Sequence, residues 1–138
     1  MKNTYVLDAC ALIAAFTDEP GHQIVRALFQ QSAAGEIHLT MHKFNLLEVY
    51  YDAIRRYGLA AAESILAFEH ENPVYIEQKL TNELFREAGR LKTSFKISIA
   101  DSIALAEASV HGGYLVTSDH HEFDAIEQSG QIKFHWIR

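Results

Sequence analysis

The sequence is poor in cysteine, poor in positive charge and free of long hydrophobic runs. Its one cysteine, Cys10, excludes an internal disulfide framework, so we expect the chain to fold in a reducing compartment. No apolar run approaches the roughly 20 residues of a membrane-spanning helix. The first residues reach Asp8 after only two apolar residues, which is unlike a secretory signal peptide. These absences predict a soluble, cytoplasmic protein with no membrane partner.

Basic residues are outnumbered, with 12 lysines and arginines against 18 aspartates and glutamates and a formal net charge of −6. This balance excludes a uniformly basic nucleic-acid-binding surface but permits a local basic patch. The sequence has no glycine-rich loop followed by lysine, which disfavours hydrolysis of nucleoside triphosphates. It also has no internal repeat, low-complexity tract or linker. With 49% hydrophobic residues, residues 1–138 are expected to form one globular domain.

Predicted strands and helices alternate along the chain. Strands are expected at 4–7, 37–40, 74–76, 114–117 and 132–137, helices at 11–16, 22–34, 44–57, 59–68, 81–92, 99–110 and 123–128, and a turn at Asn72-Pro73. The helix at 44–57 carries an apolar stripe that we expect to face the core: Phe44, Leu47, Tyr51 and Ile54. The alternation predicts right-handed crossovers and a mostly parallel central sheet covered on both faces, which is a three-layer α/β sandwich.

Acidic residues follow two of the predicted strands. Ligands of parallel sheets bind beyond the carboxyl ends of the strands, where the strand order reverses. Asp8 follows the first strand and Asp119 follows the fourth, so we expect both at one edge of the sheet. Each has an ordinary alternative role, because aspartate commonly caps the helix after a strand. Asp101 similarly lies three residues after Ser98 in a capping box, which a helix start favours without any ligand.

Glu48 borders the apolar stripe, where an unpaired carboxylate is costly unless it takes up a proton. It could instead lean into water or pair with Arg55. The candidate set therefore contains four acids from four predicted elements: Asp8, Glu48, Asp101 and Asp119. If they converge, their repulsion requires a cation, and oxygen ligands favour Mg²⁺ or Mn²⁺ over zinc. Such a site could hydrolyse nucleic-acid phosphodiesters with two ions, or with one ion and a carboxylate base.

At these residues the chain resembles the PIN-domain nucleases, and especially the small VapC-type toxins. The matching segments are YVLDACALI at 5–13, NLLEV at 45–49, SIADSIALA at 98–106 and LVTSD at 115–119, followed by Phe123 and a final strand near Trp136. The resemblance covers essentially the whole chain. It implies a Mg²⁺- or Mn²⁺-dependent endoribonuclease that acts as the toxin of a type II toxin–antitoxin pair. It further implies a homodimer and a cognate antitoxin, which lays an apolar helix on the protein and inserts a basic residue into the pocket.

The resemblance also implies roles for individual residues. The four acids would be both catalytic and metal-binding, and Thr117 would be a supporting hydroxyl that orients a carboxylate or water. The family usually has serine or threonine two residues after the first aspartate, where this chain has Cys10. Because a thiol is a weak donor, a supporting hydrogen bond is weakened there, with consequences for activity or metal affinity. A nucleophilic Cys10 is disfavoured, because the arginine that a phosphatase-type loop needs six residues later is Phe16.

Several further side chains have two open interpretations. The basic residues before Asp101 either guide RNA phosphates toward the pocket or form a solvated face: Arg86, Arg90, Lys92 and Lys96. The histidines after Asp119 either touch phosphate or lie in an exposed loop: His120 and His121. The aromatic residues that either stack bases or form core are Tyr50, Tyr51, Tyr57 and Phe95. The first-helix residues that either form a dimer surface or belong to the core are Leu12, Ile13 and Phe16.

Two other functions fit parts of the same pattern. A housekeeping PIN-type nuclease acting on RNA or DNA would use the same four acids. A catalytically weak module would bind a metal ion in the acidic pocket without cleaving a substrate. A signalling receiver is disfavoured, because it expects paired acids after the first strand and Leu7 precedes Asp8. A dehalogenase-type phosphatase is disfavoured because it needs a second aspartate at the position of Cys10.

Overall fold

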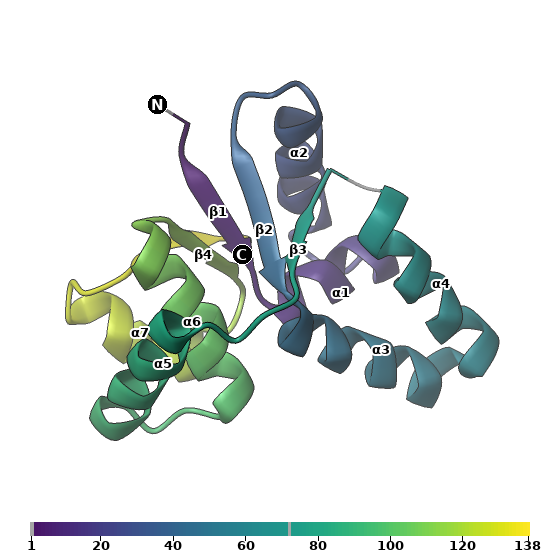
Figure 1. The fold of residues 1–138 in the computed structure, drawn as a ribbon. Helices are drawn as coiled ribbons and strands as arrows, with labels where there is room; N and C mark the ends of the chain where they lie inside the picture. The colour runs from purple at the N-terminus through teal and green to yellow at the C-terminus, as the bar shows by residue number, and fades with distance from the viewer. Residues whose placement is uncertain (1, 72) are drawn as a thin grey trace.

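The computed structural model of the protein describes residues 2–71 and 73–138, and the side chains of residues 69–71 are not described (Figure 1). The strands are β1 (Thr4–Leu7), β2 (His38–His42), β3 (Tyr75–Glu77), β4 (Tyr114–Thr117) and β5 (Lys133–Trp136). The helices are α1 (Ala9–Thr17), α2 (His22–Ala33), α3 (Lys43–Tyr57), α4 (Leu59–Glu71), α5 (Asn82–Ser94), α6 (Ile99–His111) and α7 (His120–Gln128). Each predicted strand and helix is present; β1 and β4 have the predicted bounds, and the other elements differ somewhat at their ends. The predicted turn at Asn72-Pro73 lies outside the described residues at Asn72.

The five strands form one sheet in the order β3-β2-β1-β4-β5, and every described ladder is parallel. The predicted three-layer α/β sandwich is therefore confirmed. The chain builds outward from β1 to β2 and β3, then crosses back to β4 and β5. The strand order thus reverses between β1 and β4, which pair from Tyr5 with Tyr114 to Leu7 with Val116. The carboxyl ends of these two neighbouring strands are where a ligand site is expected in a sheet of this type.

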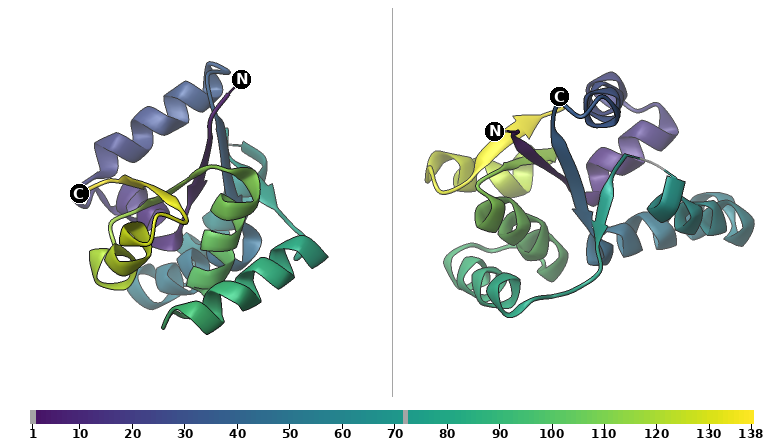
Figure 2. Two further views of the ribbon diagram at one scale, coloured as in Figure 1. Left: turned by 90° about the vertical axis from the view of Figure 1, so that its left-hand side faces the viewer. Right: turned by 45° about the horizontal axis from the view of Figure 1, so that its top comes forward.

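The two faces of the sheet carry separate hydrophobic clusters. Side chains alternate along each strand, so Val6 and Leu115 point into a cluster with α5, α6 and α7, whereas Leu7 and Val116 point into a cluster with α1 to α4. The ribbon views show the same division, with α5 to α7 on one side of the strands and α1 to α4 on the other (Figures 1 and 2). Both central strands are therefore buried on two faces, which holds their carboxyl ends in a rigid frame.

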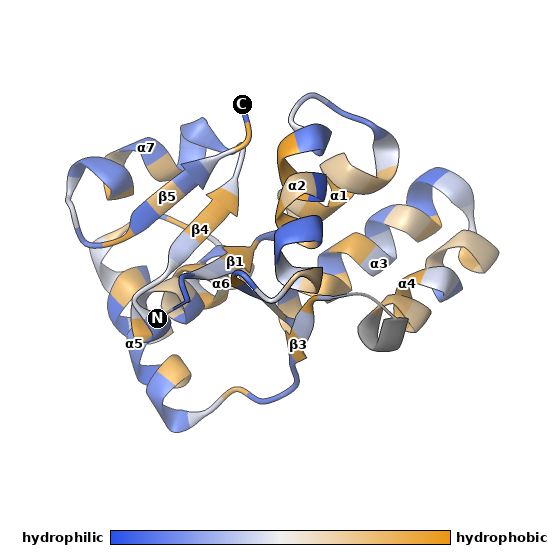
Figure 3. Cartoon of the chain, turned by 90° about the horizontal axis from the view of Figure 1, so that it is seen from above, coloured by the Kyte–Doolittle hydropathy of each residue, from blue (hydrophilic) through white to orange (hydrophobic). Residues whose placement is uncertain are grey.

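Hydropathy along the strands follows this layering. The central strand β4 is apolar at Leu115 and Val116, whereas the edge strand β5 alternates between polar and apolar residues (Figure 3). Each helix that the structure describes falls short of a bilayer-crossing segment in length or in apolar character. The apolar residues of the described helices are used mainly for packing against the sheet and against neighbouring helices.

The helix α3 buries a different stripe from the predicted one. Its buried residues are Asn45, Leu46, Val49 and Ala53. The four residues predicted to face the core are 38–52% exposed: Phe44, Leu47, Tyr51 and Ile54. That prediction is wrong because both sides of α3 are partly apolar, and helical periodicity does not decide which side meets α1, α4 and α6. The amide of Asn45 donates to the carbonyl of Ala100 at 2.9 Å, a tertiary contact that holds the rotation of the helix.

Candidate metal-binding site at the carboxyl edge of the sheet

Asp8 lies directly beyond β1 and is only 4% exposed. Its Oδ1 accepts a hydrogen bond from the backbone N–H of Ala11 at 2.9 Å, so it caps α1 as the ordinary interpretation predicted. Burial, together with the charge of Asp101, raises the pKa of Asp8 to about 6, although hydrogen bonds from Thr117, Ala11 and Cys10 oppose the shift. A capping role alone does not account for a carboxylate buried this deeply, because the cap satisfies only one of its oxygens.

Cys10 supports Asp8 from the first turn of α1. Its thiol lies 3.1 and 3.3 Å from the two carboxylate oxygens of Asp8, and 3.4 Å from the hydroxyl oxygens of both Thr117 and Ser118. Burial and the neighbouring Asp8 raise the pKa of this thiol to about 12. Cys10 therefore stays protonated near neutral pH and serves as a weak donor, which argues against a nucleophilic role.

Thr117 connects the ends of the two central strands. It is fully buried at the end of β4, and its hydroxyl oxygen accepts a hydrogen bond from the backbone N–H of Asp119 at 3.1 Å. Its side-chain hydrogen bond to Asp8 lowers the pKa of that carboxyl. Thr117 thus contacts both the first and the last of the candidate acids.

The other three candidate acids line one pocket of about 340 Å³. Glu48 comes from α3, Asp101 from the first turn of α6, and Asp119 from the N-cap of α7. Burial raises the pKa of Glu48, and the charges of Asp101 and Asp8 raise it further. Burial also raises the pKa of Asp101, with the charges of Asp119 and Glu122 adding to the effect. Asp101 therefore lies close enough to Asp8, Glu48 and Asp119 for its charge to interact with each of them.

Both capping predictions hold at this pocket. The hydroxyl of Ser98 accepts a hydrogen bond from the backbone N–H of Asp101 at 3.1 Å, and Oδ1 of Asp119 accepts from the backbone N–H of Glu122 at 3.1 Å. The Asp101 carboxyl also takes part in this cap, because hydrogen bonds from the side chain and the backbone of Ser98 lower its pKa, and the same residue lines the pocket. The helix starts thus aim acidic residues at the pocket and provide backbone N–H groups that partly offset their charge.

Glu122 is a residue of this site that the sequence prediction missed. It lines the same pocket as Asp101 and Asp119. The predicted helix began at residue 123, whereas α7 begins at His120 because Asp119 is its N-cap. An aspartate followed three residues later by glutamate is a helix-start pattern, and this pattern could have identified Glu122 from the sequence.

The donor set fits a hard divalent cation. Within residues 2–71 and 73–138, no lysine, arginine or histidine forms an ion pair with Asp8, Glu48, Asp101 or Asp119. In the same part of the chain, no three His, Cys, Asp or Glu side chains are placed closely enough to hold a metal ion. Glu48, Asp101 and Asp119 therefore line one pocket, and Asp8 is buried nearby, without these acids lying at coordination distance from a common point. A bound Mg²⁺ or Mn²⁺ would relieve their repulsion and, in this setting, polarise a phosphate and activate water.

The four basic residues predicted to contact RNA differ in their surroundings. Arg90 is held by Glu87 at 2.6 Å and by the side chain of Gln131 at 3.0 Å, and Lys92 donates to the carbonyl of Ile97 at 2.5 Å. Lys96 lines the acidic pocket. Arg86 is exposed on α5 and is not among the lining residues of that pocket. Lys96 is therefore the member of this group that lies beside the candidate acids.

The two histidines after Asp119 also differ in their surroundings. His120 stacks on Trp136, with ring centroids 3.8 Å apart, and its nitrogens lie 2.8 Å from Asp124 Oδ1 and from the carbonyl of Arg138. His121 is exposed and lines a cavity next to the acidic pocket. His120 therefore fastens α7 to the end of the chain, and His121 is left to face a ligand.

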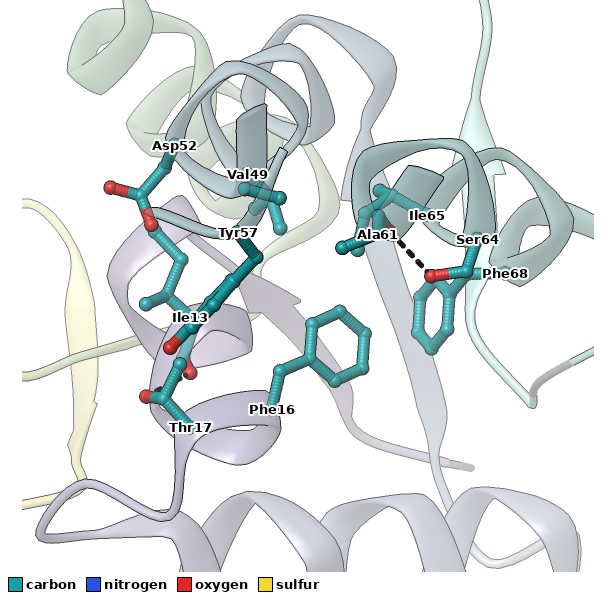
Figure 4. A pocket seen from close by; sticks show the side chains of 11 residues that line it. Ile13, Phe16, Thr17, Val49, Asp52, Tyr57, Ala61, Ser64, Ile65 and Phe68 are labelled. Atoms are coloured by element: carbon teal, nitrogen blue, oxygen red, sulfur yellow. Dashed lines mark hydrogen bonds between the residues drawn. The ribbon is translucent and has the colours of Figure 1, made fainter. Parts of the chain in front are cut away.

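An apolar groove of about 330 Å³ runs between α1, α3 and α4 (Figure 4). Phe16 faces Phe68 across it, with ring centroids 5.4 Å apart, and Ile13 and Tyr57 also line it. Leu12, one of three residues considered for a dimer surface, is fully buried in the core, whereas Ile13 and Phe16 line the groove. Val49 on α3 lines the groove while its neighbour Glu48 lines the acidic pocket, so one helix borders both.

Comparisons with known proteins agree with this fold. The family model described as PIN domain matches residues 5–128. The structure of DNA-bound VapBC from Salmonella typhimurium is similar over all of both chains, with 15% identity and a TM-score of 0.77. VapBC2 from Rickettsia felis, bound to a promoter DNA fragment, gives 17% identity and a TM-score of 0.76 over 96% of this chain and 98% of that one. VapC20 of Mycobacterium tuberculosis, a toxin that cleaves the sarcin–ricin loop, gives 17% identity and a TM-score of 0.63 over 94% and 95%. A search of curated proteins gives no match.

Proposed function

The chain belongs to the PIN-domain family of nucleases, and we propose that it is a Mg²⁺- or Mn²⁺-dependent endoribonuclease, the toxin of a type II toxin–antitoxin pair. The observation that carries this proposal is that Glu48, Asp101 and Asp119 line one pocket while Asp8, buried at the end of β1, interacts with the charge of Asp101. Among the described residues no basic side chain is paired with them. Family members generally use divalent metals, and this donor set suits Mg²⁺ or Mn²⁺.

In the proposed mechanism the four carboxylates hold the metal ion, or two ions. When bound, the metal polarises the phosphodiester and lowers the pKa of an attacking water. Asp8 is fixed by Ala11 and Cys10, so its free lone pairs point in a defined direction. Thr117 is hydrogen-bonded to the backbone of Asp119 and to the carboxylate of Asp8, and so fixes the two acids relative to each other. A carboxylate without a metal bond would take the proton from the attacking water.

The cognate antitoxin is a further part of the proposal. Solved structures similar to this fold include a toxin–antitoxin complex from Klebsiella pneumoniae and VapBC-5 from Mycobacterium tuberculosis, a member of the VapBC family of toxin–antitoxin systems, as their names state. The groove between α1, α3 and α4 suits the apolar face of an antitoxin helix, because Phe16, Phe68 and Tyr57 line it. Since α3 borders both this groove and the acidic pocket, a peptide that leaves the groove would reach the pocket with a basic residue. Such a residue would neutralise the carboxylates and compete with the metal.

The experiment that tests the nuclease is cleavage of structured RNA by purified protein in Mg²⁺, in Mn²⁺ and in EDTA. We expect metal-dependent cleavage by the parent chain and none by Asp101→Asn or Asp119→Asn, since each variant removes a charged ligand at nearly constant shape. Circular dichroism checks that both variants stay folded. Cleavage at the parental rate by both variants, or undiminished cleavage in EDTA, overturns the proposed metal pocket.

A separate experiment tests the toxin assignment. The chain is expressed under an inducible promoter with and without the product of the adjacent gene. Growth arrest that the neighbouring protein relieves supports a toxin–antitoxin pair. RNA or DNA cleavage in vitro without any growth effect instead supports a housekeeping PIN-type nuclease.

A further inference from the structure

A second cavity adjoins the acidic pocket. It has a volume of about 440 Å³ and lies between the α5–α6 connection and the first turns of α7. Phe95 and His121 line this cavity, and Lys96, Ile97 and Glu122 line both this cavity and the acidic pocket. The two hollows therefore share three lining residues and lie next to each other.

The polar side chains that line this second cavity are available to bind a ligand. In the part of the chain that the structure describes, the side chains of Lys96, His121 and Glu122 make no hydrogen bond or ion pair. The neighbouring cations Arg90 and Lys92 are, by contrast, tied to Glu87 and to a backbone carbonyl. Three free polar groups beside a cavity with an aromatic wall are arranged to meet a ligand that is both flat and polar.

We infer that the second cavity holds the base of the nucleotide next to the scissile phosphate, and that it selects guanine. This inference rests on the proposed endoribonuclease function. The rings of Phe95 and His121 offer stacking surfaces, which are how proteins commonly hold unpaired RNA bases. Lys96, between the two hollows, is placed to neutralise the phosphate that joins the cleaved and the bound nucleotides.

The choice of guanine follows from the chemistry of Glu122. An ionised carboxylate only accepts hydrogen bonds, and it has two oxygens side by side. Among the four RNA bases, guanine alone presents two adjacent donors, N1–H and the N2 amino group, on one edge. Adenine and cytosine each pair a donor with an acceptor there, and uracil flanks its one donor with two carbonyl oxygens. A carboxylate at the wall of a base-sized cavity therefore favours guanine.

The first test maps cleavage sites in an RNA library with a randomised single-stranded loop. The parent chain is expected to cut next to guanine at one fixed position relative to the cleaved bond. Glu122→Gln keeps the side-chain size but replaces one acceptor with a donor, so the guanine preference should fall about tenfold. Glu83→Gln, an exposed glutamate in the first turn of α5, is the matched control and should keep the preference.

The second test measures binding without cleavage, using the Asp101→Asn chain in EDTA and fluorescent short RNAs that differ only in one base. A guanine-containing RNA should bind more tightly than its adenine counterpart. His121→Ala and Phe95→Leu should each weaken that binding by about 5- to 100-fold, since both remove a stacking ring. Phe95→Leu retains apolar bulk, because Phe95 also packs against the core.

The two tests separate this inference from the proposed function. Metal-dependent cleavage with no base preference, or with a preference that Glu122→Gln leaves intact, overturns the guanine subsite while the nuclease stands. Selective binding of guanine-containing RNA by a chain that never cleaves supports the subsite and overturns the nuclease. Equal binding of all four bases, unaffected by His121→Ala and Phe95→Leu, overturns the subsite independently of any cleavage result.

Discussion

At the residue scale, Asp8 shows how a cap and a candidate metal ligand share one side chain. One oxygen satisfies the start of α1, and the rest of the carboxylate stays buried beside Thr117, Cys10 and the charge of Asp101. The position of Asp8 after a strand was predictable from the local sequence. Its depth of burial was not, because it depends on how α1 and β4 close over the strand end.

The first prediction concerns the pH dependence of stability. Burial raises the pKa of Asp8 to about 6 in the folded chain, against its ordinary value of 3.8. Below pH 3.8 the Asp8 carboxyl is protonated in both the folded and the unfolded chain, and above pH 6 it is ionised in both. Because the charge is buried only in the folded chain, the free energy of unfolding falls as pH rises from 3.8 to 6. The loss is on the order of 3 kcal/mol. Asp8→Asn keeps a capping side chain and removes this loss.

Urea unfolding in EDTA at pH 4 and pH 7 measures the effect. The raised pKa values of Glu48 and Asp101 also lower the free energy of unfolding as pH rises, and they do so in both proteins. The difference between the parent chain and Asp8→Asn therefore gives the contribution of Asp8. We expect Asp8→Asn to be the more stable of the two at pH 7. Identical pH dependence in both proteins would show that Asp8 is not buried as a charge.

The second prediction concerns Cys10, which stands where the family usually has a hydroxyl. Its thiol lies 3.1 Å from Asp8 and is a weaker donor than serine. Cys10→Ser should strengthen this hydrogen bond by about 1 kcal/mol, lower the pKa of Asp8 and tighten Mn²⁺ binding about fivefold. Cys10→Ala removes the donor and should weaken binding. Equal Mn²⁺ affinity in all three proteins would rule out a supporting role for this position.

At the element scale, local signals located the helices and strands but did not orient α3. A strand such as Thr4–Leu7 and a helix cap such as Ser98 can each be recognised from a few neighbouring residues in the sequence. The order of the elements was therefore predictable. The buried stripe of α3 depends on tertiary contacts such as the bond from Asn45 to Ala100. Glu122 was missed because the start of α7 was placed too late. The exposed stripe and the apolar groove could not be predicted, since both arise from helix packing.

The third prediction compares two glycine substitutions. A Cβ at Gly113, directly before β4, would lie 2.5 Å from the carbonyl oxygen of Thr4 on β1, whereas a Cβ at Gly89 inside α5 would meet nothing within 4 Å. Gly113→Ala should lower the free energy of unfolding by about 1–3 kcal/mol through overpacking. Gly89→Ala should raise it by about 0.5–1 kcal/mol through helix propensity. Chemical denaturation measures both, and equal effects would contradict the tight approach of β1 and β4.

At the scale of the whole molecule, the strand order explains why distant acids meet. The switch between β1 and β4 brings Asp8 and Asp119 to neighbouring strand ends, and the crossovers carry α3 and α6 over the same edge. This neighbourhood was predictable from a parallel sheet alone. The same packing leaves α3 with an exposed apolar stripe that includes Leu47 and Tyr51, and we place the predicted homodimer contact on this stripe.

The fourth prediction tests that contact. Leu47 is 52% exposed, so Leu47→Glu should leave the fold and its thermal stability nearly unchanged. It should convert a dimeric parent chain into a monomer, because a charge would be buried at the contact. Light scattering after size exclusion gives the mass of each. A monomeric parent chain, or a Leu47→Glu chain that stays dimeric, would contradict a dimer contact on α3.

The central claim is that buried Asp8 and the three acids that line the pocket bind a divalent metal ion. Direct measurement of Mn²⁺ binding by electron paramagnetic resonance tests this claim without relying on any substrate. The parent chain at pH 7 should remove free Mn²⁺ from solution in a saturable manner, and Asp8→Asn, Asp101→Asn and Asp119→Asn should each weaken that binding severely. Competition by Mg²⁺ should release the bound Mn²⁺. A parent chain that leaves Mn²⁺ free, or three variants that bind it as tightly as the parent, would contradict the claim.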